Sequence, residues 1–167
     1  MIKLKGNAID FLESINSDRN VVLVHQVNCQ GVMGSGIALE IKKRYPQHYH
    51  DYMNTYSTYR DVGLLSRLVA TDISPSKAIV GIFGQQFYGS AGEGKRYTNY
   101  AALLHGLTTI SSSGDGWDIV IPKNIGCDRG GANWEFVEAF LKDLEDILKV
   151  NIYVVEYSDK NSWELLH

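Results

Sequence analysis

The stretch that decides the fold of this chain is VNCQGVMGSGIA, at residues 27–38. It follows an apolar run at residues 21–24 that is typical of a buried strand, and it precedes a helical pattern at residues 39–44. Glycines let the backbone approach a ligand closely, and the N–H groups of a helix start point at an anion. This first glycine loop (residues 27–38) therefore predicts either a phosphate-binding loop or a set of ordinary turn glycines. Its spacing matches neither the dinucleotide-binding G-x-G-x-x-G pattern nor the G-K-[ST] ending of an ATP-binding loop.

The bulk composition is that of one globular domain spanning residues 1–167. The chain is 44% hydrophobic and 21% charged, and its net charge of -3 gives no general footprint for nucleic acid. Two cysteines, Cys29 and Cys127, are too few for a secreted disulfide scaffold. The sequence has no apolar run of membrane-spanning length and no signal-peptide core, so we expect a cytoplasmic protein that does not bind a membrane.

Strand and helix patterns alternate along the chain, which predicts an α/β fold. Strands are expected at residues 2–5, 21–27, 64–71, 79–83, 117–122 and 152–157. Helices are expected at residues 8–12, 36–45, 47–59, 99–110 and 134–148, with Ser35, Thr98 and Asn133 as N-caps. Residues 84–95 form a loop and residues 158–167 a surface tail in this prediction. The alternation favours a three-layer α/β/α domain with a mixed, mostly parallel central sheet.

A second glycine-rich segment, the second glycine loop, has the sequence IGCDRGGAN at residues 125–133. Both glycine loops follow a predicted strand and precede a predicted helix. Ligands of open α/β sheets bind outside the carboxyl ends of the strands. The two loops are therefore expected to hold opposite sides of one phosphorylated ligand.

Three motifs in order, KGN at residues 5–7 and the two glycine loops, resemble the macro domain family of ADP-ribose-binding modules. The likeness extends along the chain to about Tyr157. The segment GIFGQQFYGS at residues 81–90, followed by GEGK and NY, is most similar to ADP-ribose-1″-phosphate phosphatases. These belong to a branch that also contains terminal ADP-ribose glycohydrolases. The resemblance implies hydrolysis of ADP-ribose-1″-phosphate to ADP-ribose and phosphate. No cofactor is expected, and no metal site is expected either, because zinc needs three or four converging ligands.

The resemblance also implies where the ligand lies. The distal ribose would meet the amide of Asn28, and the diphosphate would lie between the backbones of the two glycine loops. Adenine would lie near Asn7, whose carbonyl can accept a bond where many family members carry Asp. Tyr157 would stack on the base, or would be a core or rim tyrosine. The expected ligand-binding residues are Asn7, Ala8, Asn28, Gly34, Ser35, Gly36, Ile37, Gln85, Ser90, Gly126, Cys127, Arg129, Gly130, Gly131 and Tyr157.

The reaction is harder to assign from residue types. Glycohydrolase members use a lysine at a position that falls here on Gln85 or Gln86, and glutamine has no nucleophilic amine. His25 is the candidate proton-handling group by resemblance, and the alternative is a satisfied core histidine. Asp128 is the candidate that orients water or acts as base, and the alternative is a turn-capping carboxylate.

Two other functions stay open alongside the phosphatase. The chain could be a non-catalytic reader of ADP-ribose, since both loops are present without an unambiguous catalytic group. It could also remove ADP-ribose from protein or nucleic acid, so ADP-ribosylated macromolecules are candidate partners. A nucleophilic cysteine is a third chemical alternative, because a helix start lowers the pKa of a thiol.

Overall fold

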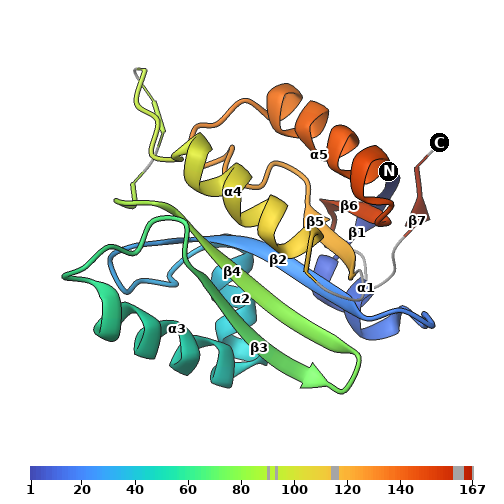
Figure 1. Ribbon diagram of the computed structural model, residues 1–167, viewed down its shortest axis with the longest axis horizontal. Coiled ribbons are helices and arrows are strands. Elements are labelled where there is room, and N and C mark those ends of the chain that lie inside the picture. The colour runs from blue at the N-terminus through green and yellow to red at the C-terminus, as the bar shows by residue number, and fades with distance from the viewer. Residues whose placement is uncertain (90, 93, 114–116, 160–163, 167) are drawn as a thin grey trace.

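The computed structural model describes residues 1–89, 91–92, 94–113, 117–159 and 164–166. Within them, one sheet has the strand order β3-β4-β2-β5-β6-β1-β7 (Figure 1). Its strands are β1 (Ile2–Gly6), β2 (Val21–Asn28), β3 (Leu68–Ser74), β4 (Lys77–Gln85), β5 (Asp118–Pro122), β6 (Ile152–Tyr157) and β7 (Glu164–Leu165). The helices are α1 (Ala8–Ser14), α2 (Gly36–Arg44), α3 (Pro46–Tyr59), α4 (Tyr100–Ser111) and α5 (Trp134–Leu148).

The sheet is mixed and mostly parallel, as the sequence predicts. Strands β4, β2, β5, β6 and β1 pair in parallel, whereas the edge strands β3 and β7 are antiparallel to their neighbours. Nearly every residue of β2 is buried, because helices cover both of its faces. The carboxyl ends of the five parallel strands consequently meet along one edge of the sheet.

Helices form the two outer layers, and the three-layer α/β/α prediction is confirmed. Helices α4 and α5 lie together on one face, and α2 and α3 lie on the other (Figure 1). Leu107 and Val137 pack with Val22 and Ile119 in the first core, whereas α1 and α2 pack against the opposite face of the sheet. No helix among the described residues is long and apolar enough to cross a membrane.

Several boundaries differ from the sequence prediction; β4, for example, spans Lys77–Gln85 rather than residues 79–83. Two of the differences have a clear local cause. Strand β3 begins at Leu68 rather than at residue 64, because Ser66 has a left-handed φ of 74° that interrupts an extended chain. The N-cap of α4 is Asn99, whose Oδ1 accepts a bond from Ala102 N at 3.0 Å. Thr98 is not the cap, since its hydroxyl is used elsewhere.

The C-terminal segment adds to the sheet. Glu164 and Leu165 are exposed, as expected of a surface tail, but they pair with Lys5 and Leu4 as the short antiparallel strand β7. The pairing covers part of the outer edge of β1, so fewer backbone groups of this strand remain unpaired.

Candidate functional site

A cleft of about 820 Å³ opens where the parallel strands end. Its walls are the two glycine loops and the start of α2. This size and this position are typical of ligand sites in open α/β sheets. The predicted site residues that line the cleft are Asn7, Ala8, His25, Asn28, Gly34, Ser35, Gly36, Ile37, Gln85, Gly126, Cys127, Asp128, Arg129, Gly130 and Tyr157.

Two predicted residues are not among the described residues that line the cleft. Ser90 lies outside the described residues. Gly131 instead closes the second glycine loop, where its N–H donates to Cys127 O at 2.9 Å and its φ is +73°. A Cβ at this position would meet Lys95 O at 3.0 Å, so glycine is required for loop closure rather than for ligand contact.

The amide of Asn28 is engaged mainly within its own loop. Its Oδ1 accepts bonds from Gln30 N at 3.0 Å and from the Tyr52 hydroxyl at 2.9 Å. Its Nδ2 donates to Val32 O at 2.8 Å. An amide nitrogen carries two protons, so one Nδ2 proton remains for a ligand in the cleft.

The start of α2 offers backbone donors to the cleft. Ser35 occupies the N-cap position, but its side chain accepts no bond from the helix within the described chain. Gly36 follows with a φ of +56°, and Gly36 and Ile37 both line the cleft. The first N–H groups of a helix have no intrahelical acceptor, and the helix dipole places partial positive charge there. This wall therefore suits an anionic group.

The second glycine loop is held against the segment that precedes α4. The Thr98 hydroxyl donates to Gly126 O at 2.6 Å, and Gly130 O accepts from Tyr97 N at 2.8 Å and Thr98 N at 2.9 Å. A Cβ on Gly130 would overlap both Thr98 Oγ1 and the carbonyl of Gly126. Close packing of backbone on backbone thus fixes the position of this wall.

Gln26, which the sequence analysis did not single out, connects the floor of the cleft to this wall. Gln26 Nε2 donates to Gln85 Oε1 at 2.7 Å and to Thr98 Oγ1 at 2.8 Å. Next to it, Tyr88 N donates to Gln30 Oε1 at 2.8 Å. The loop after β4 is thereby joined to the first glycine loop, and Gln26 joins β4 to Thr98, which holds the second.

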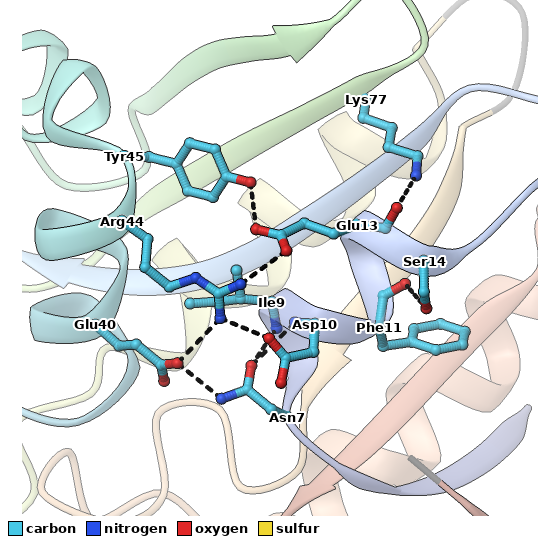
Figure 2. A network of polar contacts seen from close by, with 10 residues as sticks. All are labelled: Asn7, Ile9, Asp10, Phe11, Glu13, Ser14, Glu40, Arg44, Tyr45 and Lys77. Carbon is cyan, nitrogen blue, oxygen red and sulfur yellow. Dashed lines mark hydrogen bonds and ion pairs between the residues drawn. The ribbon is translucent and has the colours of Figure 1, made fainter. Parts of the chain in front are cut away.

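Asn7 has a different role from the expected acceptor of the base. Its Oδ1 accepts bonds from Ile9 N at 2.9 Å and Asp10 N at 3.0 Å and thus caps α1 (Figure 2). Its Nδ2 donates to Glu40 Oε1 at 2.7 Å. The carbonyl of Asn7 is therefore already used, and Glu40, which sequence reasoning missed, is the acidic group at this end of the cleft.

Tyr157 lies at the same end of the cleft, at the carboxyl end of β6. It is 71% exposed, so it is a rim tyrosine and not a core residue. Ala8, which is buried under the start of α1, contributes an apolar surface nearby. An exposed ring beside apolar atoms suits a flat aromatic ligand.

His25 lines the cleft, but its ring is buried beside a second histidine, so its role as the proton-handling group stays a prediction. The residue is 0% exposed, and its Nε2 lies 2.8 Å from Nε2 of His48 in α3. Burial, with His48 beside it, holds the pKa of His25 well below its ordinary value. His48 in turn contacts Thr71 Oγ1 at 2.8 Å. Nδ1 of His25 has no hydrogen-bond partner among the described residues, so His25 is not a fully satisfied core histidine either.

Asp128 and Arg129 are exposed on the second glycine loop, at the rim of the cleft. Lys123 also lines the cleft, and its Nζ pairs with Glu156 at 3.1 Å. Burial, followed by the nearby Asp128, raises the pKa of Cys127 to about 11, which disfavours a thiolate. Among the described residues, no three His, Cys, Asp or Glu side chains converge on a possible metal site.

Comparison with known proteins gives relatives along most of the chain. No family model matches the sequence. A relative from Lodderomyces elongisporus, named ADP-ribose 1''-phosphate phosphatase, is 30% identical over 155 residues, covering 87% of this chain and 94% of that protein. A DNA ADP-ribosyl glycohydrolase of Mycobacterium tuberculosis is 60% identical over 30 residues, 18% of this chain and 8% of that protein. The macrodomain of Mycobacterium tuberculosis DarG has a TM-score of 0.66 at 24% identity, covering 84% of this chain and 90% of that chain, and shows the same fold.

Proposed function

The chain belongs to the macro domain family, and from this premise we propose that it binds ADP-ribose and hydrolyses ADP-ribose-1″-phosphate to ADP-ribose and phosphate. The observation that carries the proposal is the cleft between two glycine loops, with the uncapped start of α2 on one wall. Backbone donors on two facing walls suit a diphosphate, because each N–H meets the ligand without the cost of ordering a long side chain. The relative named as a phosphatase supports the reaction.

The proposed ligand runs along the cleft from Tyr157 to Gln85. The base lies beside Tyr157, and the diphosphate lies between the start of α2 and the second glycine loop. The distal ribose takes the remaining Nδ2 proton of Asn28. The terminal phosphate then lies near Gln85 and Tyr88, which both line the cleft.

Hydrolysis needs a water molecule that attacks phosphorus while the bond from phosphorus to the anomeric oxygen breaks. The water loses a proton, and the departing oxygen gains one. Asp128 is the proposed group that orients this water, because it is an exposed carboxylate on the cleft rim, whereas His25 is fully buried and its Nε2 is engaged by His48. Arg129 supplies positive charge to the phosphate.

The test is to incubate the protein with ADP-ribose-1″-phosphate and to follow phosphate and ADP-ribose by chromatography. Asp128→Asn should lower kcat by roughly 100-fold or more, the usual contribution of a general base, while ADP-ribose still binds. Asp61→Asn is the matched control, because Asp61 is an exposed carboxylate outside the residues that line the cleft. Full turnover by Asp128→Asn would overturn the residue assignment, and absence of ADP-ribose binding at millimolar ligand would overturn the whole proposal.

A second candidate function is removal of ADP-ribose from DNA. It is supported by the local identity to the mycobacterial DNA ADP-ribosyl glycohydrolase. The glutamines at the lysine position of the glycohydrolases argue against a lysine-dependent version of this reaction. Loss of label from ADP-ribosylated DNA on a gel, without phosphate release from ADP-ribose-1″-phosphate, would favour this function. Tight binding of ADP-ribose without either reaction would indicate a non-catalytic ADP-ribose-binding protein.

A further inference from the structure

A chain of four polar side chains connects the cleft to a half-buried carboxylate in α3. His25 lines the cleft, and its Nε2 lies 2.8 Å from Nε2 of His48. Nδ1 of His48 lies 2.8 Å from the hydroxyl oxygen of Thr71 in β3. That hydroxyl lies 2.6 Å from Oδ2 of Asp51. All three distances are those of hydrogen bonds, so the four groups form one continuous chain.

The carboxylate gives the chain a direction. An ionised carboxylate only accepts hydrogen bonds, so the Thr71 hydroxyl donates its single proton to Asp51. The oxygen of Thr71 can then only accept, and Nδ1 of His48 must be the protonated nitrogen. Burial lowers the pKa of His48 to about 4, so this histidine is neutral near pH 7 and carries one ring proton. Its Nε2 therefore carries no proton.

The direction passes on to His25. Because Nε2 of His48 is an acceptor, the proton between the two rings belongs to Nε2 of His25. Burial, followed by the neighbouring His48, holds the pKa of His25 well below its ordinary value, so His25 is neutral as well. A neutral imidazole with a proton on Nε2 has none on Nδ1. Nδ1 of His25 is thus an acceptor.

The neighbouring strand makes room for the ring of His25. His25 pairs with Gly81 in the interior of β4. A Cβ at Gly81 would lie 3.4 Å from Nε2 of His25 and 3.0 Å from a side-chain carbon of Val69. A glycine inside a strand often marks such a close approach. The missing side chain therefore lets Nε2 of His25 reach its contact with His48.

The chain ends at an acceptor that has no partner from the protein. Nδ1 of His25 is buried and has no hydrogen-bond partner among the described residues. An unpaired buried acceptor is costly, and in native proteins such a group calls for an explanation, such as a catalytic role or a bound water or ion. A bare imidazole nitrogen pairs with a donor, and the hydroxyl groups of a sugar are donors. Its place beside the cleft therefore points to a ligand that carries hydroxyl groups.

We propose that the chain from Asp51 to His48 holds His25 in the tautomer with a bare Nδ1, and that this atom accepts a hydrogen bond from a hydroxyl group of the ligand in the cleft. Asp51, Thr71 and His48 are positioning residues, because none of them lines the cleft. The hydroxyl contact rests on the proposed binding of ADP-ribose, whereas the tautomer does not.

Nitrogen NMR of the imidazole rings tests both parts, because bare and protonated ring nitrogens resonate far apart. Near pH 7, His25 of the native protein should show a bare Nδ1 and a protonated Nε2. Saturating ADP-ribose should move the Nδ1 signal of His25 toward the protonated range, as a hydrogen bond does. A protonated Nδ1 in the ligand-free protein would overturn the proposal. A bare Nδ1 that saturating ADP-ribose does not move would overturn the ligand contact and leave a buried water molecule as the donor.

Thr71→Val tests whether the chain sets the tautomer. The change keeps the volume of the side chain but removes the acceptor of His48 Nδ1, so both histidines can adopt the opposite tautomer. The Nδ1 signal of His25 should move to that of a mixture, and ADP-ribose affinity should fall roughly 3- to 10-fold, the worth of one hydrogen bond. Thr71→Ser is the matched control, because it keeps the hydroxyl and should keep both the tautomer and the affinity.

The outcomes separate a role of the chain from a merely structural effect and from the proposed function. Loss of affinity in Thr71→Val while His25 keeps its native tautomer, or equal loss in Thr71→Ser, would overturn the role of the chain. Failure of the folded native protein to bind ADP-ribose at millimolar concentration would overturn the proposed function and the hydroxyl contact. The signals of the ligand-free native protein would still decide the tautomer, even if Thr71→Val did not fold.

Discussion

The hydroxyl oxygen of Tyr52 lies 2.8 Å from the main-chain oxygen of Asn28 and 2.9 Å from its side-chain Oδ1. The same hydroxyl accepts a bond from Val32 N at 3.1 Å. Tyr52 is fully buried in α3 and stacks on Phe83 of β4 at a ring distance of 5.4 Å. Helix α3, which contributes no residue to the lining of the cleft, thus holds the first glycine loop in place.

Tyr52→Phe is expected to weaken both folding and ligand binding. The change keeps the ring but leaves the buried oxygen of Asn28 and the N–H of Val32 without this partner, which should cost about 1–3 kcal/mol of unfolding free energy. ADP-ribose affinity should fall as well, because the loop is less ordered. Urea unfolding and calorimetric titration measure the two effects. Tyr56→Phe, on the same helix, is the control, and an equal loss in it would contradict a specific role of Tyr52.

Gly130→Ala is expected to disturb the second glycine loop. The added methyl group would overlap Thr98 Oγ1 and the backbone of Gly126, so the loop must shift, at a cost of about 1–3 kcal/mol for an overpacked site. Thermal unfolding and ADP-ribose titration should both detect the change. At Gly92 a Cβ has open space, so Gly92→Ala should have little effect. Native-like affinity in Gly130→Ala would show that the ligand does not depend on this wall.

The two walls of the cleft could be predicted from the sequence because they depend on backbone geometry. Glycine is the residue that tolerates the positive φ of Gly36 and Gly126, so glycines that follow apolar runs mark where the backbone turns toward a ligand. The mostly parallel sheet follows from the alternation of strand and helix patterns. Predicting this sheet does not require knowing which side chains contact one another.

The side chains that complete the site could not be predicted in this way. Glu40 and Tyr52 lie within ordinary helical patterns, and only the packing of α1 and α3 against the loops gives them partners. The partners of His25 could not be predicted either, because its strand is buried on both faces. Its imidazole contacts His48 of α3, whereas the next residue, Gln26, contacts Thr98 at the cleft wall.

Cys127→Ser is expected to keep turnover, although Cys127 lines the cleft. Burial raises the pKa of this thiol and that of Cys29 to about 11. At neutral pH the thiolate is then about one part in 10,000 of the thiol, which is too little for a nucleophile. Phosphate release by the variant is the measurement, with alkylation of the native protein by iodoacetamide as a second check. Loss of turnover together with retained ADP-ribose binding would restore the cysteine mechanism.

Stability should fall as the pH falls through the range set by the buried histidine pair. Burial lowers the pKa of His48 from 6.5 to about 4, so the unfolded chain binds this proton at a higher pH than the native protein does. Between these values the unfolded state carries more protons, and the unfolding free energy decreases by about 3 kcal/mol from this group. The contribution of His48 to stability is complete above pH 6.5, and the lowered pKa of His25 acts in the same direction.

Urea unfolding across this range should show a flatter pH dependence for His48→Gln than for the native protein. His50→Gln, which changes an exposed histidine two residues away, should keep the native slope. An equally steep decline in His48→Gln would show that the pH dependence arises from other groups.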